Sequence, residues 1–348
     1  MKALALKYRP QQFSDVIGQE YTVKILQNQI NNDNVKQAYL FVGSAGTGKT
    51  TVARIFAKNV NGTTDGIIEI DAASNNSVKD IRELRETCQF KPLGQSYNYK
   101  VYIIDECHSI TSEAANALLK TLEEPPEHVI FILCTTDPQK LPFTILSRCQ
   151  RFDFRRIVNE KIVEQLKFIR QSEGVSITDE SLWYIAVASQ GNLRDAIMIF
   201  ETCINYKEDI TVDEVAELLQ EVKLSDCFDL AEFIIDNNYK EVIRIIDAIY
   251  MSGKNMKDFI KRFLEFVVDV QKYFITRDLR CTRISDEYKN RIDKLLDLKI
   301  RPLIWDRMGG LVDLLVGISV QVRDEGQYRN ILLSKLFGYM FLTDRELK

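Results

Sequence analysis

The sequence lacks the features of a membrane-spanning or disulfide-stabilised protein. No apolar run in its 348 residues approaches the length needed to cross a bilayer. The apolar stretch at the start is too short, before Lys7 and Arg9, to form a secretory signal. The seven cysteines are odd in number, widely scattered and without a CxxC pair, so neither a disulfide framework nor a zinc cluster is expected. These absences predict a reduced, cytoplasmic protein.

Strong charge and repetition are also missing. A net charge of −4 argues against a chain that coats nucleic acid through bulk charge, although it leaves room for a local basic surface. The sequence shows no internal repeat and no low-complexity tail. Its 45% apolar content is enough for packed cores, and its length predicts two or three domains.

The most informative segment that is present is a glycine-rich loop, GSAGTGKT, at residues 43–50. It follows an apolar run at 38–42, expected to be a buried strand, and precedes a helix-like run at 51–58, which is the context of a phosphate-binding P-loop. The glycines let successive N–H groups converge on one anion, and the helix N-terminus adds its dipole. Lys49 would meet the β and γ phosphates and Thr50 would bind Mg²⁺. A chance match, or a site that binds a nucleotide without hydrolysing it, is the alternative.

Two acids, Asp105 and Glu106, end a second apolar run at residues 101–104. Such a run predicts a buried parallel strand, and ligands bind at the carboxyl ends of these strands. Asp105 is expected to hold Mg²⁺, directly or through water, and Glu106 to orient and deprotonate the attacking water. A solvated strand end is the alternative for this pair. A further strand at 129–134 ends near Thr136, whose hydroxyl could hold the hydrolytic water, although a threonine at a strand end is common without such a role.

The order of the patterns predicts an α/β part followed by a helical part. Between the strands, including one at 67–70, helices are expected at residues 21–31, 77–85 and 112–124, with Ser77 as an N-cap. This alternation predicts a parallel sheet covered on both faces. Beyond about residue 155 only helical patterns occur, and Asn192 is expected to cap a helix with Arg194 in its first turn.

The last part, from residue 225, contains wide apolar faces at helical spacing. Their members are Val242, Ile245, Ile246 and Ile249 on one face, and Phe259, Phe263, Phe266, Val267 and Val270 on another. These faces can form the core of a helical bundle, a subunit interface, or both. Gly309, Gly310 and Gly317 are expected to interrupt the later helices.

Together these residues resemble the AAA+ ATPases of bacterial clamp loaders, the gamma/tau family of DNA polymerase III subunits. The likeness covers most of the chain and is densest from residue 7 to residue 154. Its most specific stretches are EIDAASNN at 69–76, NALLKTLEEPPEHV at 116–129 and ILSRCQ at 145–150. The SRC triplet at 147–149 is typical of clamp loaders, and AAA+ motors in general lack it.

The resemblance implies the fold class, the domains and the function. The expected fold is an α/β AAA+ P-loop domain with a parallel sheet at residues 1–155, a small all-α lid at 156–221 and an all-α collar at 222–348. The implied function is an ATP-hydrolysing motor subunit of a sliding-clamp loader in DNA replication. ATP binding would open and grip the clamp, and primer–template DNA would trigger hydrolysis and release of the clamp. Implied partners are other loader subunits, in a pentamer joined by the collar, the clamp and primed DNA, with no membrane.

The resemblance also assigns roles to residues, with ATP and Mg²⁺ as cofactors. Thr136 would be the sensor beside the γ-phosphate, Arg194 a second sensor reaching from the lid, and Arg148 an arginine finger acting in trans on a neighbour's ATP. The nucleotide would lie against Tyr8, Arg9, Val16, Ile17, Gly43, Ser44, Ala45, Gly46, Thr47, Gly48, Lys49, Thr50 and Thr51. DNA backbone contacts would come from Arg82, Lys120 and Thr144. On physical grounds alone, residues 7–10 indicate an ordinary arm, and Arg82 and Lys120 ordinary exposed helix cations.

The sequence departs from the family pattern in three places. A four-cysteine zinc module usually follows the P-loop helix, but only residues 61–66 lie there and they contain no cysteine, so zinc is not expected. Cys107 stands where an aliphatic residue is usual. The chain stops at Lys348, before the tail that binds polymerase and helicase in the long form, and a compact loader from a phage or a divergent bacterium is expected.

Two alternatives remain open at this point. A non-hydrolysing structural subunit of the same assembly would share the fold, but such subunits tend to lose P-loop or acidic residues that this chain keeps. Another AAA+ machine, such as a branch-migration motor or a helicase loader, would share the ATP site. The SRC triplet and the helical C-terminal third argue against that second alternative.

Overall fold

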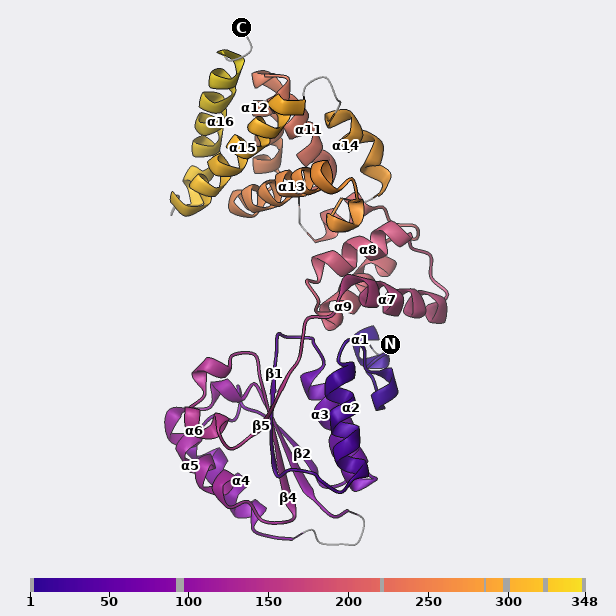
Figure 1. Ribbon diagram of the computed structural model, residues 1–348, viewed down its shortest axis with the longest axis vertical. Coiled ribbons are helices and arrows are strands. Elements are labelled where there is room, and N and C mark those ends of the chain that lie inside the picture. Colours follow the sequence, from indigo (N-terminus) through magenta and orange to yellow (C-terminus); the bar gives the residue numbers. More distant parts are fainter. Residues whose placement is uncertain are drawn as a thin grey trace. The chain divides into compact units, whose positions relative to one another are not determined.

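The computed structural model of the protein describes residues 3–91, 97–219, 222–284, 286–296, 301–321 and 325–345 (Figure 1). The chain forms two compact units, Met1–Ile169 with Ala188–Met198 and Arg170–Val187 with Ile199–Lys348. These units divide the residues of the predicted lid between them. The predicted boundary at residue 221 and the chain end at Lys348 lie outside the described residues. The division into three domains therefore stays a prediction.

The first unit is built on a parallel sheet whose five strands have the order β2-β3-β4-β1-β5. The strands are β1 (Ala38–Val42), β2 (Ile67–Asp71), β3 (Lys100–Asp105), β4 (Val129–Thr135) and β5 (Gln150–Asp153). The first four confirm the predicted apolar runs. The fifth was not predicted, because its four residues, QRFD, contain one buried side chain and present no apolar run.

Helices cover both faces of this sheet, as the alternating pattern predicted. On one face lie α2 (Glu20–Asn31) and α3 (Lys49–Asn61), and on the other α4 (Val78–Cys88) and α5 (Ser112–Glu123) (Figure 1). Successive side chains of a strand point to opposite faces of the sheet, so each face has its own apolar core. Tyr39 and Phe41 of β1 pack toward α2 and α3, whereas Leu40 packs toward α4 and α5. Ser77 caps α4 with a capping box, as expected, and the helix runs three residues past residue 85.

Short elements complete the first unit. They are α1 (Leu4–Lys7), α6 (Phe143–Leu146) and the 3₁₀ turns Phe13–Asp15, Cys107–Ser109 and Pro138–Lys140. The helices α7 (Asn159–Glu173) and α9 (Leu193–Tyr206) begin in this unit and continue into the second. Asn192 caps α9 as predicted, because its Oδ1 accepts a hydrogen bond of 3.2 Å from the amide of Asp195.

The second unit consists of helices. These include α8 (Asp179–Ala188), α10 (Val212–Leu218), α11 (Leu224–Ile235), α12 (Tyr239–Met251), α13 (Met256–Thr276), α14 (Lys289–Leu295), α15 (Arg301–Gln321) and α16 (Tyr328–Arg345). One apolar core joins α11 to α16 and contains the predicted faces of α12 and α13. The core interpretation is therefore confirmed for these residues, of which Ile245 alone is only partly buried. In the described part of the chain, no helix is both long enough and apolar enough to cross a membrane.

The expectation that glycines interrupt the later helices is wrong. Helix α15 runs without a break through Gly309, Gly310 and Gly317. A Cβ built on Gly310 would lie 3.0 Å from the ring of Tyr339 in α16, so the missing side chain permits a close approach of the two helices. At Gly310, this packing offsets the helix-propensity cost of a glycine, which is about 1 kcal/mol.

Candidate nucleotide site

The P-loop connects the carboxyl end of β1 to α3 and has the backbone that an anion site needs. Gly46 and Gly48 have φ values of +67° and +99°, in the region that L side chains rarely adopt. Gly48 is the N-cap of α3, so the first free N–H groups of that helix lie at the loop. A Cβ at Gly43 would lie 2.4 Å from the carbonyl oxygen of Phe154, which explains glycine at this point too.

Lys49 folds back over this loop. Its side chain is 5% exposed, and its Nζ donates to the carbonyls of Gly43 at 2.7 Å and of Ser44 at 3.0 Å. Burial lowers the pKa of this lysine. An anion bound in the loop would offset this lowering of the pKa, because it would favour the charged form of the side chain.

Thr50, in the first turn of α3, contacts Asp105, the last residue of β3. Thr50 Oγ1 donates to Asp105 Oδ2 at 2.7 Å, and the other carboxylate oxygen accepts the amide of Glu106 at 3.0 Å. A hydroxyl oxygen and a carboxylate oxygen are the hard ligands that Mg²⁺ prefers. The two predicted metal-binding residues are therefore adjacent, and their chemistry fits that ion.

Glu106 lies beside Asp105 in an uncommon backbone conformation. Its φ and ψ are 46° and 42°, in the left-handed region, which costs free energy for a residue with a Cβ. Its Oε2 accepts a hydrogen bond of 3.2 Å from Thr136 Oγ1. The structure thus brings together the predicted base and the predicted sensor, which are 30 positions apart in the sequence.

Sequence reasoning missed His108. Its Nδ1 lies 3.3 Å from Glu106 Oε2 and 3.1 Å from Thr135 Oγ1. The only signal in the sequence is its place two residues after Glu106. The neighbouring Cys107 is buried, as its small size suggested, and burial raises the pKa of its thiol.

The N-terminal arm contacts the P-loop helix through Arg9. The Nε of Arg9 donates to Thr51 Oγ1 at 3.0 Å. Burial lowers the pKa of Arg9, and the positive charges of Arg54 and Arg194 lower it further. Tyr8 packs edge-on against Phe168 at a centroid distance of 6.1 Å. Arg9 therefore lies beside the P-loop helix among charges of both signs, because the carboxylates of Glu69 and Asp105 act in the opposite direction and raise its pKa.

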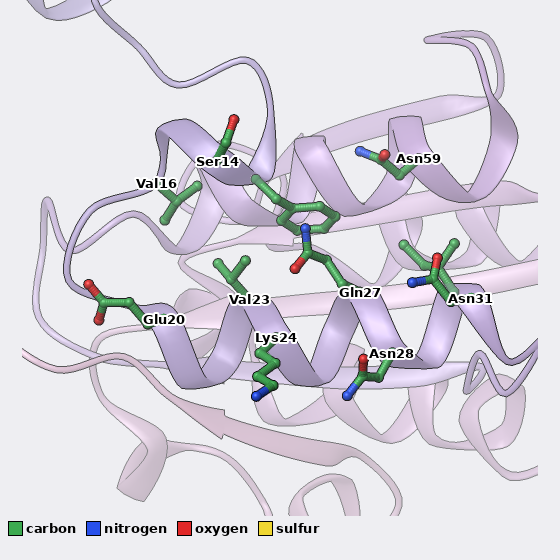
Figure 2. Close-up of a pocket in the computed structure, with 11 residues that line it drawn as sticks. Ser14, Val16, Glu20, Val23, Lys24, Gln27, Asn28, Asn31 and Asn59 are labelled. Carbon is green, nitrogen blue, oxygen red and sulfur yellow. The ribbon is translucent and has the colours of Figure 1, made fainter.

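Val16 and Ile17 are half-buried, and their predicted adenine-binding role stays a prediction. Val16 lines a groove of about 680 Å³ between the arm, α2 and Asn59 of α3 (Figure 2). The groove is lined by Phe13, Ser14, Val16, Glu20, Val23, Lys24, Gln27, Asn28, Ile30, Asn31 and Asn59. None of these residues belongs to the P-loop, so this groove is separate from the phosphate site.

The cap of α9 lies on the P-loop. A Cβ built on Gly46 would stand 1.5 Å from Asn192 Oδ1, so the asparagine occupies the space that a side chain at Gly46 would need. Two positions further on, Arg194 is exposed on the first turn of α9, and its charge acts on Arg9. Arg194 is therefore on the helix whose cap lies on the P-loop, and its role as a second sensor stays a prediction.

Arg148 and the predicted DNA contacts are in other parts of the first unit. Arg148 Nη2 pairs with Glu123 Oε1 at 2.6 Å, and its Nη1 donates to the carbonyl of Thr144 at 2.9 Å. Among the hydrogen bonds and ion pairs of the described residues, Arg148 has none with the P-loop. Arg82, Lys120 and Thr144 are exposed. The roles of all four remain predictions.

Comparisons with known proteins support the fold and the family. Residues 18–71 and 65–158 match the family described as DNA polymerase III, delta subunit, and residues 164–204 match the RCF1/5-like AAA+ ATPase lid domain. RuvB, the Holliday junction branch migration motor of Thermotoga maritima, aligns with a TM-score of 0.51 and 22% identity, over 66% of this chain and 80% of that one. Because the identity is so low, this likeness shows the AAA+ fold alone.

Curated relatives are more similar in sequence. DNA polymerase III subunit tau of Bacillus subtilis is 42% identical over 295 residues, which are 78% of this chain and 52% of that protein. The gamma subunit of Buchnera aphidicola subsp. Acyrthosiphon pisum is 33% identical over 314 residues, 84% of this chain and 86% of that protein. The chain spans about half the length of the tau relatives that it matches. From its P-loop site, its AAA+ fold and this similarity, the chain belongs to the DNA polymerase III gamma/tau family.

Proposed function

We propose that this chain is an ATP-hydrolysing motor subunit of a sliding-clamp loader. The observation that carries the proposal is the convergence of a complete ATPase set at one sheet edge, in a member of the gamma/tau family. Thr50 contacts Asp105 at 2.7 Å, and Thr136 contacts Glu106 at 3.2 Å, beside the buried Lys49. A structural subunit without hydrolysis would not need this complete set, so it is the weaker candidate.

ATP would be bound by groups that in this structure contact the backbone of the P-loop. Lys49 Nζ would exchange the carbonyls of Gly43 and Ser44 for β and γ phosphate oxygens, and the N–H groups at the start of α3 would bind the same anion. Thr50 and Asp105 would hold Mg²⁺, which neutralises charge on the phosphates when it is bound. Arg9 and Arg194 would add positive charge near this end of α3.

Hydrolysis would use Glu106 as the base. Its carboxylate would take a proton from a water molecule while that water attacks the γ-phosphorus, and the bond to the leaving ADP would break. Thr136, which donates to Glu106 Oε2, is placed to orient both the carboxylate and the water. The Asp105 carboxylate, engaged by Thr50 and by the amide of Glu106, would remain a metal ligand.

Arg148 would act on the ATP of a neighbouring subunit. It shares no hydrogen bond or ion pair with its own P-loop among the described residues, and it is held by Glu123 and Thr144 on the surface of the first unit. An arginine finger is worth about 10³ to 10⁵ in rate. An isolated chain would therefore bind ATP and hydrolyse it very slowly.

The partners follow from this mechanism and the family. We infer a pentameric assembly with other loader subunits, joined by the helices that follow residue 222, and a sliding clamp gripped in the ATP-bound state. Primer–template DNA would be held through its phosphates by Arg82, Lys120 and Thr144. Because loader subunits of the bacterial relatives act on DNA that is being replicated, the inferred site of action is the cytoplasm.

The experiment is steady-state ATP hydrolysis by the chain with its partner subunits, with and without clamp and primed DNA. We expect strong stimulation by clamp and DNA together. Arg148→Ala should lower the stimulated rate by about 10³ or more and leave ATP affinity unchanged. Arg151→Ala is the matched control, because Arg151 is an exposed arginine of β5 that pairs with Asp153 at 2.7 Å. Normal turnover in the Arg148→Ala assembly would exclude the trans role.

A further inference from the structure

Gln19, the residue before α2, joins the P-loop to the segment that leads to the lid. Its side chain is 4% exposed, so its amide lies inside the first unit. The Nε2 group donates to the carbonyl of Thr47 at 3.2 Å and to the carbonyl of Arg155 at 2.7 Å. The Oε1 atom accepts a hydrogen bond of 3.2 Å from the amide of Arg155. One side chain thus binds backbone groups at two distant places in the chain.

The chemistry of these contacts requires an amide side chain. Two donated hydrogen bonds and one accepted bond use both N–H groups and the carbonyl of glutamine. A glutamate would place a carboxylate against the carbonyls of Thr47 and Arg155 and would lose both donors. A methionine of similar length would leave all three backbone groups without this partner, and an unsatisfied buried polar group is costly.

Both ends of this connection lead to residues of the proposed ATP site. Thr47 precedes Gly48 and Lys49 in the P-loop. On the other side, two residues beyond Arg155, the amide of Ile157 donates to the carbonyl of Gly191 at 3.2 Å. Asn192, whose Oδ1 lies beside Gly46, follows Gly191 directly. Arg194 comes two residues after Asn192.

A continuous series of contacts therefore begins at the P-loop and returns to it. It passes through Gln19 to residues 155–157, then to Gly191, and back to the P-loop through Asn192. Two contacts close it against the P-loop, at Thr47 and at Gly46. Because interiors are close-packed and deform little, a shift of the loop at Thr47 has to be accommodated at Arg155.

We propose that Gln19 is a positioning residue that couples the P-loop to the linker at residues 155–157, and through it sets the position of Arg194 when ATP binds. The proposal rests on the proposed function of this site as an ATPase site with Arg194 as a sensor. Among the hydrogen bonds of the described residues, the side chain of Gln19 contacts backbone groups and no phosphate-binding side chain. Its effect is therefore on how ATP binding is transmitted rather than on the chemical step.

The test is hydrogen exchange of the full chain, read by mass spectrometry, with and without MgATP. In the wild type, ATP should slow exchange in a peptide covering residues 43–50 and in one covering residues 154–158. In Gln19→Met, saturating ATP should still protect residues 43–50, but its protection of residues 154–158 should be lost. Gln27→Met is the matched control, because Gln27 is an exposed glutamine in α2, the helix that Gln19 precedes.

A double-mutant cycle separates coupling from a simple structural role. Gln19→Met should weaken ATP binding about tenfold, the equivalent of roughly one hydrogen bond, in the otherwise wild-type chain. In an Arg194→Ala background the same change should cost less than about threefold, because the sensor is already absent. An equal loss in both backgrounds would show that Gln19 only supports the fold and would overturn the proposal. Gln19→Asn, which keeps the amide but is one methylene too short to reach both backbone sites, serves as the second variant if Gln19→Met does not fold.

The outcomes also separate this proposal from the proposed function. If ATP protects residues 43–50 but not residues 154–158 in the wild type, the coupling is wrong and the ATP site stands. If Gln19→Met keeps the full ATP-dependent protection of residues 154–158, the coupling is likewise wrong. If ATP protects neither segment of the wild type, the chain does not bind ATP in its P-loop, and the proposed function and the coupling both fail.

Discussion

The carboxylate of Glu106, the proposed base, has two neighbours that can hold it. Thr136 donates to its Oε2, and His108 Nδ1 lies 3.3 Å from the same atom. The buried hydroxyl of Thr135 already accepts from the amide of Asp137 at 3.0 Å, and its proton needs an acceptor. If His108 Nδ1 is that acceptor, it cannot also donate to Glu106. The tautomer of His108 therefore decides whether Glu106 has one donor or two.

We expect His108→Leu to lower kcat for stimulated ATP hydrolysis about tenfold, or ~1.4 kcal/mol, with ATP affinity unchanged. The reason is that leucine can neither donate to Glu106 nor accept the proton of Thr135, so one of these two groups loses a hydrogen bond. His108→Asn should recover most of the rate, because its amide reaches the position of Nδ1 and can donate or accept. The measurements are steady-state hydrolysis and equilibrium nucleotide binding. A wild-type kcat in His108→Leu would contradict this positioning role.

Helix α10 depends on a reciprocal cap at its N-terminus. Thr211 Oγ1 accepts from the amide of Glu214, and Glu214 accepts from the amide of Thr211 at 2.9 Å and from Lys207 at 2.7 Å. Hydrogen bonds from Lys207 and then from Thr211 lower the pKa of Glu214 to about 2. Because the folded pKa lies below the ordinary value, the charged carboxylate stabilises the fold above the ordinary pKa.

This stabilisation should be lost as pH falls from about 4.5 toward about 2. We expect Glu214→Gln to lower the free energy of unfolding by about 1 kcal/mol at pH 7, since the ion pair is at the surface and the cap supplies most of the effect. The difference from wild type should shrink toward zero near pH 2. Chemical denaturation across this range measures it, with Glu208→Gln as the control. A difference that does not change with pH would contradict the assignment.

Elements with a local signal could be predicted from the sequence. Four apolar runs gave four strands, and Ser77 and Asn192 cap the helices that they were expected to cap. The P-loop and the acids that end β3 were also recognisable, because their chemistry is contained in a few adjacent residues. Their meeting at one edge followed from the parallel sheet.

Features that depend on distant partners could not be predicted. Strand β5 is short and mostly exposed, and it pairs with β1 without an apolar run of its own. Helix α15 passes through three glycines, and the contact that explains one of them, between Gly310 and Tyr339 of α16, is with a distant residue. Gln19 contacts Arg155 from 136 positions away, and no local pattern in the sequence indicates such a pair.

Across the whole molecule, the proposed ATP site and the largest helical core belong to different units. The P-loop, Asp105, Glu106 and Arg194 are in the first unit, whereas the core of α11 to α16 is in the second. A ligand that binds only the native site stabilises the unit that contains it, by about 2.7 kcal/mol at a hundred times its Kd. A core truncation destabilises the unit that contains the lost contacts.

We therefore expect MgATP and Phe263→Ala to act on different thermal transitions. Phe263 of α13 is buried in the core formed by α11 to α16. Its truncation should lower the free energy of unfolding of the second unit by about 3 to 5 kcal/mol and leave ATP affinity unchanged. MgATP should raise the transition of the first unit in both proteins. Ile275→Ala is the control, because Ile275 is on the same helix and 69% exposed. Calorimetry of the full chain measures this, and a truncation that weakened ATP binding as much as it lowered stability would contradict it.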